Sequence, residues 1–252
     1  MIEFRNVSFA HGKKKILDNV SFTCDKGKIT SIIGRNGAGK TSALKCLVGI
    51  NAYSGKILYK GNDIRKIPPA MRAKTISYFP QILPNAPFTV YELASLGRRP
   101  YQTRIGKLTE EDREQIERAL EASDMRAFSE RRVDTLSGGE RQRAYLSMIL
   151  AQNTDIIALD EPAAYMDASV EGEMHALLRK LCTDTGKTII EAIHNLTRAV
   201  NDTDKIVVFK EGSVILESDA ESIRNGKDIE EIFSVKKGVF LSNDGEKRIA
   251  YL

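Results

Sequence analysis

Residues 34–42 read Gly34-Arg35-Asn36-Gly37-Ala38-Gly39-Lys40-Thr41-Ser42. An apolar run with strand character, residues 29–33, precedes this segment, and a helix-like pattern over residues 43–48 follows it. Glycines between a strand and a helix let consecutive backbone N–H groups point at an anion, and the helix N-terminus adds partial positive charge. The alternative is a glycine-rich turn that only caps a helix. Because the spacing and both flanking elements fit, the sequence favours a phosphate-binding loop, here called the phosphate loop.

The side chains of the phosphate loop predict a nucleotide with its metal ion. Lys40 is expected to reach the β- and γ-phosphates, and the Thr41 hydroxyl is expected to hold Mg²⁺. The residues predicted to bind the nucleotide here are Gly34, Asn36, Gly37, Ala38, Gly39, Lys40, Thr41 and Ser42.

The composition narrows the class of protein. The chain has 252 residues, of which 42% are hydrophobic, so it can bury a substantial core. Its net charge is only +4, and basic residues are dispersed among acidic ones, so we expect no nucleic-acid partner. Neither a secretory signal nor an apolar run of membrane-spanning length is visible, which predicts a soluble, cytoplasmic protein. Cys24, Cys46 and Cys182 lie far apart in sequence and are expected to be reduced core residues.

The pattern of elements predicts an α/β fold. Two antiparallel strands lead into the strand before the phosphate loop, and further strands are expected over residues 55–62 and 74–80. Residues 84–152 are mostly helical, with a helix from Val90 to Leu96 and another from Thr109 to Ser123. Strands at 155–160 and 187–193 flank a helix at about 169–183, and this alternation predicts a parallel sheet with helices on its faces. A hairpin around residues 210–213 and a short helical tail complete the chain.

Two carboxylates follow a strand that the sequence predicts to be buried. Residues 156–162 read Ile-Ile-Ala-Leu-Asp-Glu-Pro, so Asp160 and Glu161 lie at the carboxyl end of a strand. Ligands of open α/β sheets bind beyond these strand ends. Asp160 is suited to Mg²⁺, and Glu161 is suited to accept a proton from an attacking water. The alternative, an acidic surface turn, is less favoured because the phosphate loop is present.

A second decisive segment is Leu136-Ser137-Gly138-Gly139-Glu140-Arg141-Gln142-Arg143, here called the signature segment. Structurally, Ser137 and Glu140 form a capping box on a helix. Two consecutive glycines at a helix start cost conformational entropy, and what they offer is close backbone approach to an anion. Both roles are compatible, since a capped helix N-terminus is also an anion site.

With these segments in order, the chain resembles the nucleotide-binding subunit of an ATP-binding cassette (ABC) transporter. The resemblance covers nearly the whole chain and includes Gln81 after its strand and His194 after a later one. It implies a P-loop NTPase core of the RecA-like type, with an N-terminal antiparallel β subdomain and an inserted α-helical subdomain. The implied division is a core at 1–83 and 153–221, a helical subdomain at 84–152 and a tail at 222–252.

The resemblance also implies roles for individual residues. Two copies would sandwich two ATP molecules, with Ser137, Gly138 and Gly139 of one copy meeting the γ-phosphate bound by the other. Gln81 would sense Mg²⁺ and the attacking water, and His194 would contact the γ-phosphate; the alternatives are a polar loop residue for Gln81 and a helix-capping residue for His194. Asp167 matches the dimer-contact loop only at its aspartate.

The chain departs from the family pattern at three places. Where a tyrosine usually stacks on adenine it offers His11, with Phe9 as a possible substitute and a plain loop histidine as the alternative. Thr41-Ser42 reverses the commoner order of hydroxyl residues, and Asn195 stands where aspartate often follows the histidine.

Residues 88–101 narrow the resemblance to importers of iron–siderophore, haem or cobalamin-type chelates. The expected function is therefore that of an ATP-hydrolysing energy-coupling subunit, peripheral on the cytoplasmic face of the membrane. Its partners would be transmembrane permease subunits and, indirectly, an extracytoplasmic substrate-binding protein. The alternatives are an importer subunit for another solute and a soluble ABC ATPase on a cytoplasmic scaffold, such as one for iron–sulfur cluster assembly. An interaction module without turnover is disfavoured, since Glu161 and His194 are both present.

Overall fold

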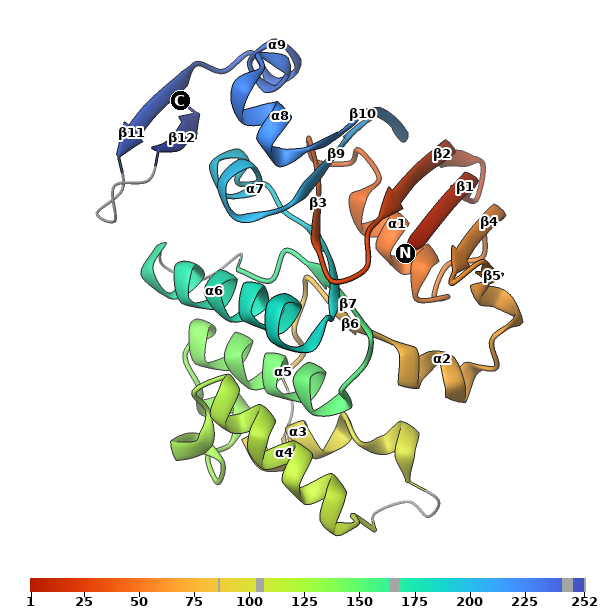
Figure 1. Ribbon diagram of the computed structural model, residues 1–252. Helices are drawn as coiled ribbons and strands as arrows, with labels where there is room; N and C mark the ends of the chain where they lie inside the picture. Colours follow the sequence, from red (N-terminus) through yellow and green to blue (C-terminus); the bar gives the residue numbers. More distant parts are fainter. Residues whose placement is uncertain (86, 103–106, 164–167, 242–246, 252) are drawn as a thin grey trace. The chain divides into compact units, whose positions relative to one another are not determined.

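A computed structural model describes residues 1–85, 87–102, 107–163, 168–241 and 247–251. The chain forms two compact units (Figure 1). Unit 1 combines residues 1–65 with residues 188–252, and unit 2 is the continuous segment 66–187.

Unit 1 begins with an antiparallel sheet in the strand order β2-β1-β4-β5. Its strands are β1 (Ile2–His11), β2 (Lys14–Cys24), β4 (Ser54–Tyr59) and β5 (Asn62–Asp63). Apolar side chains such as Phe4 and Phe22 are buried, and their rings stack with centroids 4.2 Å apart. The predicted antiparallel strands before the phosphate loop are confirmed.

The second group of strands in unit 1 carries the phosphate loop. The strand β3 (Ile29–Gly34) is completely buried and pairs in parallel with β8 (Thr188–Ala192) and with β9 (Lys205–Lys210). The strand β10 (Ser213–Asp219) adds to β9 as the predicted hairpin. The helices of this unit are α1 (Lys40–Leu47), α7 (Leu196–Asp202), α8 (Ala220–Asn225) and α9 (Asp228–Phe233), and a 3₁₀ turn, η1 (Ile64–Lys66), lies where the first part of the unit ends.

The end of the chain differs from the prediction. Two short helices do follow β10, but the chain then forms a second hairpin of β11 (Lys237–Leu241) and β12 (Lys247–Tyr251), so the predicted helical tail is wrong for the last residues. Val239 and Ile249 pair across this hairpin, and Ile249 is buried in the same apolar cluster as residues of α7 and α8. The hairpin is held because its inner strand completes that cluster.

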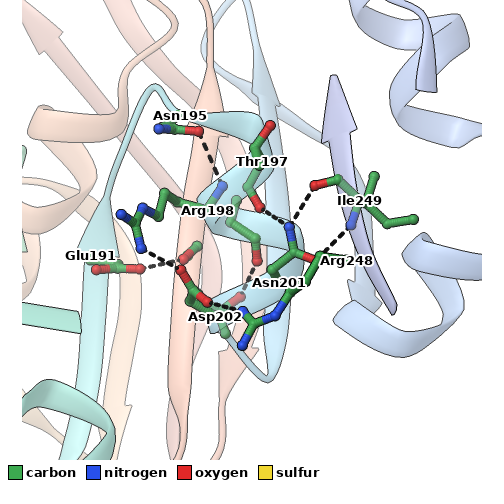
Figure 2. Close-up of polar contacts among 11 residues, drawn as sticks. Glu191, Asn195, Thr197, Arg198, Asn201, Asp202, Arg248 and Ile249 are labelled. Carbon is green, nitrogen blue, oxygen red and sulfur yellow. Dashed lines mark hydrogen bonds and ion pairs between the residues drawn. The ribbon is translucent and has the colours of Figure 1, made fainter. Parts of the chain in front are cut away.

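Side chains of α7 bind the backbone of β12 (Figure 2). The Asn201 amide donates to the carbonyl of Ile249 at 2.7 Å and accepts from its N–H at 2.9 Å, as a neighbouring strand would do. The Thr197 hydroxyl accepts from the N–H of Tyr251 at 3.1 Å, and Asp202 accepts from Arg248 at 2.8 Å. The free edge of β12 is therefore satisfied by a helix.

Unit 2 contains two parallel strands and a group of helices. The strands are β6 (Ile76–Phe79) and β7 (Ile156–Asp160), which pair from Ile76 opposite Ile156 to Phe79 opposite Leu159. The helices are α2 (Pro69–Thr75), α3 (Val90–Leu96), α4 (Glu110–Ala122), α5 (Gly138–Gln152) and α6 (Ala168–Thr185), with 3₁₀ turns η2 (Arg99–Tyr101), η3 (Arg126–Phe128) and η4 (Val133–Thr135). Lys74 and Thr75 were expected in a strand but end α2, because prolines at 68 and 69 start a helix there.

A buried polar cluster fixes the helices of unit 2. Arg98 and Asp112, each 3% exposed, form an ion pair with 2.9 Å between Nε and Oδ1. Arg98 also donates to the carbonyl of Ala151 at 2.8 Å and lies 3.9 Å from the ring centroid of Tyr101. A Cβ atom on Gly97 would lie 2.2 Å from the carbonyl oxygen of Met148, so only glycine permits this approach. Residues 97–101 are thus a packing element that joins α3 and α4 to α5.

Across the part of the chain that the structure describes, no helix combines the length and the apolar character needed to cross a membrane.

Candidate functional site

The phosphate loop has the backbone that its glycines predict. A Cβ atom at Gly34 would lie 2.4 Å from the carbonyl oxygen of Phe209, so the loop leaves β3 through a gap that admits no side chain. Gly39 stands at the N-cap of α1 with φ of 107°, a left-handed conformation that favours glycine. No side chain forms a capping hydrogen bond at the N-terminus of α1, which is the helix end where an anion is expected to bind.

Lys40 lies across the phosphate loop. The residue is 6% exposed, and its ammonium donates to the carbonyls of Gly34 at 2.8 Å and Arg35 at 3.4 Å. The ammonium is thereby held at the loop that is predicted to surround the phosphates. Thr41 and Ser42 follow in the first turn of α1 and are partly exposed.

Two hairpins of unit 1 brace this loop. The N–H of Gly212, in the turn between β9 and β10, donates to the carbonyl of Ala38 at 3.1 Å, and Leu17 of β2 lies against Gly39. Phe9, opposite Leu17 in the pairing of β1 with β2, is partly buried, while His11 is exposed at the end of the same strand. Both candidates for a base contact therefore lie on the hairpin that packs on the loop.

The loop opens onto a cavity of about 520 Å³ in unit 1. Residues 35–38 form one wall, residues 209–211 another, and residues 231–234 from the end of α9 a third. The segment before the C-terminal hairpin therefore borders the phosphate loop, which the sequence did not predict.

His194 lies at the same edge of unit 1 as the phosphate loop. Ala192 pairs with Ile32 in the parallel register of β3 and β8, so both strands end together and His194 follows at the level of Gly34. His194 is exposed and does not cap α7, because Asn195 is the N-cap and accepts from the N–H of Arg198 at 3.1 Å. The capping alternative for His194 is therefore wrong, and the capping role belongs to Asn195.

In unit 2 the buried carboxylate Asp160 has an aromatic partner. Asp160 is completely buried at the end of β7, and its Oδ2 accepts a hydrogen bond from the Tyr78 hydroxyl at 3.1 Å. Burial and the neighbouring carboxylate both raise the pKa of Tyr78, so its hydroxyl stays protonated and donates. Sequence reasoning missed Tyr78, because its contact with Asp160 follows from the pairing of β6 with β7, which only the structure gives.

Glu161 and Gln81 lie together in the same unit. The Gln81 amide donates to Glu161 Oε2 at 2.9 Å, which joins the ends of β6 and β7. Glu161 has φ of 51°, an uncommon left-handed conformation for a residue with a side chain. Such backbone strain, of order 1 kcal/mol, clusters at functional sites and here turns the chain immediately after Asp160.

The signature segment begins α5 with the predicted capping box. Ser137 Oγ accepts from the N–H of Glu140 at 3.3 Å, and Glu140 Oε2 accepts from the N–H of Ser137 at 2.8 Å. These hydrogen bonds lower the pKa of Glu140. A Cβ atom on Gly139 would meet no atom within 4 Å, so packing within the chain does not require glycine there. Asp167, the remaining predicted site residue, lies outside the described residues.

The donor set fits Mg²⁺ in a nucleotide site. Among the described residues, no group of three or more histidine, cysteine, aspartate or glutamate side chains could hold a metal ion. Mg²⁺ beside a nucleotide needs only one or two protein oxygens, because phosphates and water complete its octahedron. The buried Asp160 carboxylate offers an oxygen of this kind in unit 2, and the Thr41 hydroxyl offers one in unit 1.

Comparison with known proteins agrees with this series of segments. Residues 17–164 match the family model described as ABC transporter. The petrobactin import ATP-binding protein YclP of Bacillus subtilis is 39% identical, with 93% of each chain covered. The iron(3+)-hydroxamate import ATP-binding protein FhuC of the same species is 36% identical (91% and 86% covered), and the ferric enterobactin transport ATP-binding protein FepC of Escherichia coli is 30% identical (91% and 86%).

Solved structures agree with the fold. A dimeric bacterial ABC transporter cassette has a TM-score of 0.78 and 25% identity, covering 87% of this chain and 99% of the cassette. A metal-chelate type ABC transporter in an inward-facing conformation has a TM-score of 0.84 at 20% identity, covering 100% and 97%, and supports the fold alone. The predicted α/β fold of an ABC ATPase is confirmed, and the chain belongs to the ABC transporter family, as one of its ATP-binding, ATP-hydrolysing members.

Proposed function

We propose that this chain is the energy-coupling ATPase subunit of an importer for iron–siderophore complexes or similar metal chelates. The observation that carries the proposal is the similarity, over more than nine-tenths of the chain, to three import or transport ATP-binding proteins named for ferric siderophore cargoes. The proposed place of action is the cytoplasmic face of the cell membrane.

The nucleotide in this proposal is ATP with Mg²⁺. The N–H groups of residues 34–39 and the Lys40 ammonium bind the phosphates, and Thr41 and Ser42, in the first turn of α1, add their hydroxyl groups to the site. His11 or Phe9 stacks on the base. Asp160 and Thr41 are the residues that would hold the metal ion, which would neutralise negative charge on the phosphates.

Hydrolysis in this proposal starts at Glu161. Its carboxylate accepts the proton of the attacking water, and Gln81, which already binds Glu161, orients that water. His194 contacts the γ-phosphate from the edge that it shares with the phosphate loop. The water oxygen bonds to the γ-phosphorus while the bond from that phosphorus to the β–γ bridging oxygen breaks, and the products ADP and phosphate then leave the site.

A second copy completes the proposed site. Ser137, Gly138 and Gly139 of one copy bind the γ-phosphate held by the other, and Asp167 contributes to the contact between copies. The open space at Gly139 supports this, because a glycine that packing within the chain does not require remains available to a ligand and a partner. Closure on ATP and reopening after hydrolysis would drive the transport cycle.

The proposed membrane partner is a permease. Ile82, directly after Gln81, is 80% exposed, and Phe88 of the same segment is exposed as well. These two side chains are the proposed contacts with the permease, and their closeness in sequence to Gln81 would couple docking to the nucleotide. An extracytoplasmic binding protein would deliver the chelate to the permease.

The test is affinity purification of the tagged protein from gently solubilised native membranes, followed by mass spectrometry. Copurification of a multi-span permease supports the proposal, and a companion binding protein would then identify the cargo by its own ligand. Ile82→Ser should reduce the permease yield several-fold, with the exposed Ile50→Ser of unit 1 as the control. A soluble scaffold without a membrane partner would refute the importer and favour a cytoplasmic ABC ATPase.

A further inference from the structure

Tyr78 is a hydrogen-bond donor in unit 2 to which the proposed function assigns no role. It lies on β6, opposite Ala158 of β7, and its hydroxyl reaches Asp160 Oδ2 at 3.1 Å. Both strands belong to unit 2 and end at the same edge, where Gln81 and Glu161 also meet. Tyr78 therefore contacts a carboxylate of the site from within β6, whereas Gln81 and Glu161 lie beyond the ends of their strands.

The hydrogen bond constrains the carboxylate that it contacts. Asp160 is completely buried, so water does not surround its oxygens as it would at a surface. A donor fixed on the neighbouring strand restricts rotation of the carboxylate plane about its terminal torsion, which is otherwise broad. Hydrogen bonds of this kind to metal-binding groups set their orientation, and removing one costs about 10- to 100-fold in metal affinity.

The hydrogen bond of Tyr78 differs from that of Tyr145, a second tyrosine in unit 2. A role in stability explains the bond of Tyr145 better than the bond of Tyr78. Tyr145 of α5 is buried and donates to the carbonyl of Pro84 at 2.7 Å, which satisfies a backbone group. Tyr78 instead directs its hydroxyl to the buried side chain that the chain needs for its metal ion.

We propose that Tyr78 is a positioning residue for Mg²⁺: its hydroxyl holds the Asp160 carboxylate in the orientation that binds the metal ion of Mg·ATP. The inference rests on the proposed role of Asp160. Tyr78 touches neither the nucleotide nor the metal ion, and acts through Asp160 alone.

The experiment compares Tyr78→Phe with the matched control Tyr145→Phe in the full-length protein. Each variant loses one hydroxyl and keeps its ring. Mn²⁺ serves as the probe, since electron paramagnetic resonance measures its binding to the protein with ATP without any turnover. Tyr78→Phe should weaken Mn²⁺ affinity about 10- to 100-fold. It should also raise the Mg²⁺ concentration for half-maximal hydrolysis, while ATP affinity measured in EDTA stays at the wild-type value. Tyr145→Phe should leave all three quantities unchanged.

Asp160→Asn separates failure of the inference from failure of the proposed role of Asp160. If Asp160→Asn loses Mn²⁺ affinity and Tyr78→Phe keeps it, Tyr78 has no positioning role and only the inference is overturned. If Asp160→Asn keeps wild-type Mn²⁺ affinity, Asp160 is not the metal ligand and both fall. An equal loss in Tyr78→Phe and Tyr145→Phe would also overturn the inference, because general loosening of unit 2 would then explain the effect.

Discussion

Replacing Arg98 by methionine should destabilise unit 2 strongly. Methionine keeps most of the length of the side chain and removes the guanidinium. Asp112 would then remain 3% exposed without its ion-pair partner, and the carbonyl of Ala151 would lose a donor. Breaking a buried pair from one side costs about 3–5 kcal/mol, because the remaining charge stays desolvated. At about 2–4 °C per kcal/mol, the midpoint of thermal unfolding should fall by roughly 6–20 °C.

The dependence on pH has a defined sign. Burial by itself raises the pKa of Asp112, but hydrogen bonds from Thr109 together with the Arg98 guanidinium outweigh burial and hold this pKa below its ordinary value. A carboxyl whose pKa is lowered by folding contributes stability above its unfolded pKa of about 3.9 and loses it as the pH falls through the folded pKa. The difference between wild type and Arg98→Met should therefore be largest near neutral pH and narrow below about pH 4.

Circular dichroism is the suitable assay, since the chain contains no tryptophan. Urea and thermal unfolding of Arg98→Met would be compared with Arg118→Ala on α4, whose pair with Glu114 spans 3.2 Å at the surface. The exposed pair should contribute less than about 0.5 kcal/mol. The double variant Arg98→Met/Asp112→Asn, which also removes the stranded charge, should recover part of the loss. An Arg98→Met variant as stable as Arg118→Ala would refute the reasoning, since it would mean that Asp112 finds other solvation.

Three further outcomes are expected. Glu161→Gln should retain ATP binding and lower turnover about 10²- to 10⁴-fold, the usual contribution of a general base; near-normal phosphate release would remove Glu161 from that role. Gly97→Ala should lower the unfolding midpoint by several degrees, because its Cβ would lie 2.2 Å from the Met148 carbonyl, whereas Gly139→Ala, which meets no atom within 4 Å, should unfold near the wild-type temperature. Asn201→Ala should expose the C-terminal hairpin to proteolysis and fast hydrogen exchange while α5 stays protected, and equal protection of β12 in both proteins would show that the Asn201 amide does not hold it.

The sequence predicted the elements whose signals are local. The phosphate loop, the capping boxes at Thr109 and Ser137 and the helix from Val90 to Leu96 are each encoded within a few residues, and the structure has them where the sequence places them. The three cysteines are also buried and form no disulfide, as predicted.

The remaining features depend on partners far apart in the chain. Tyr78 is 82 residues from Asp160, and nothing near either residue reveals the hydrogen bond. The C-terminal hairpin was missed for a similar reason. Residues 237–241 carry only a weak strand pattern, and β12, which pairs with β11 along one edge, is held along its other edge by Asn201, 48 residues before Ile249. Residues 97–101 belong to the sequence pattern recognised over residues 88–101, but their packing against α5 could be found only in the structure.

The discontinuity of unit 1 has a consequence for synthesis. The fully buried strand β3 leaves the ribosome early, but both of its parallel partners, β8 and β9, follow the whole of unit 2. About 150 residues separate the end of β3 from the start of β8, which corresponds to roughly 8–30 s of translation at ordinary rates. Unit 2 is continuous and can complete its own contacts during that interval. Until β8 and β9 are synthesised, the apolar side chains of β3 stay exposed and its edges stay unpaired. The nucleotide-binding part of the nascent chain is therefore the part most exposed to aggregation and to chaperone binding.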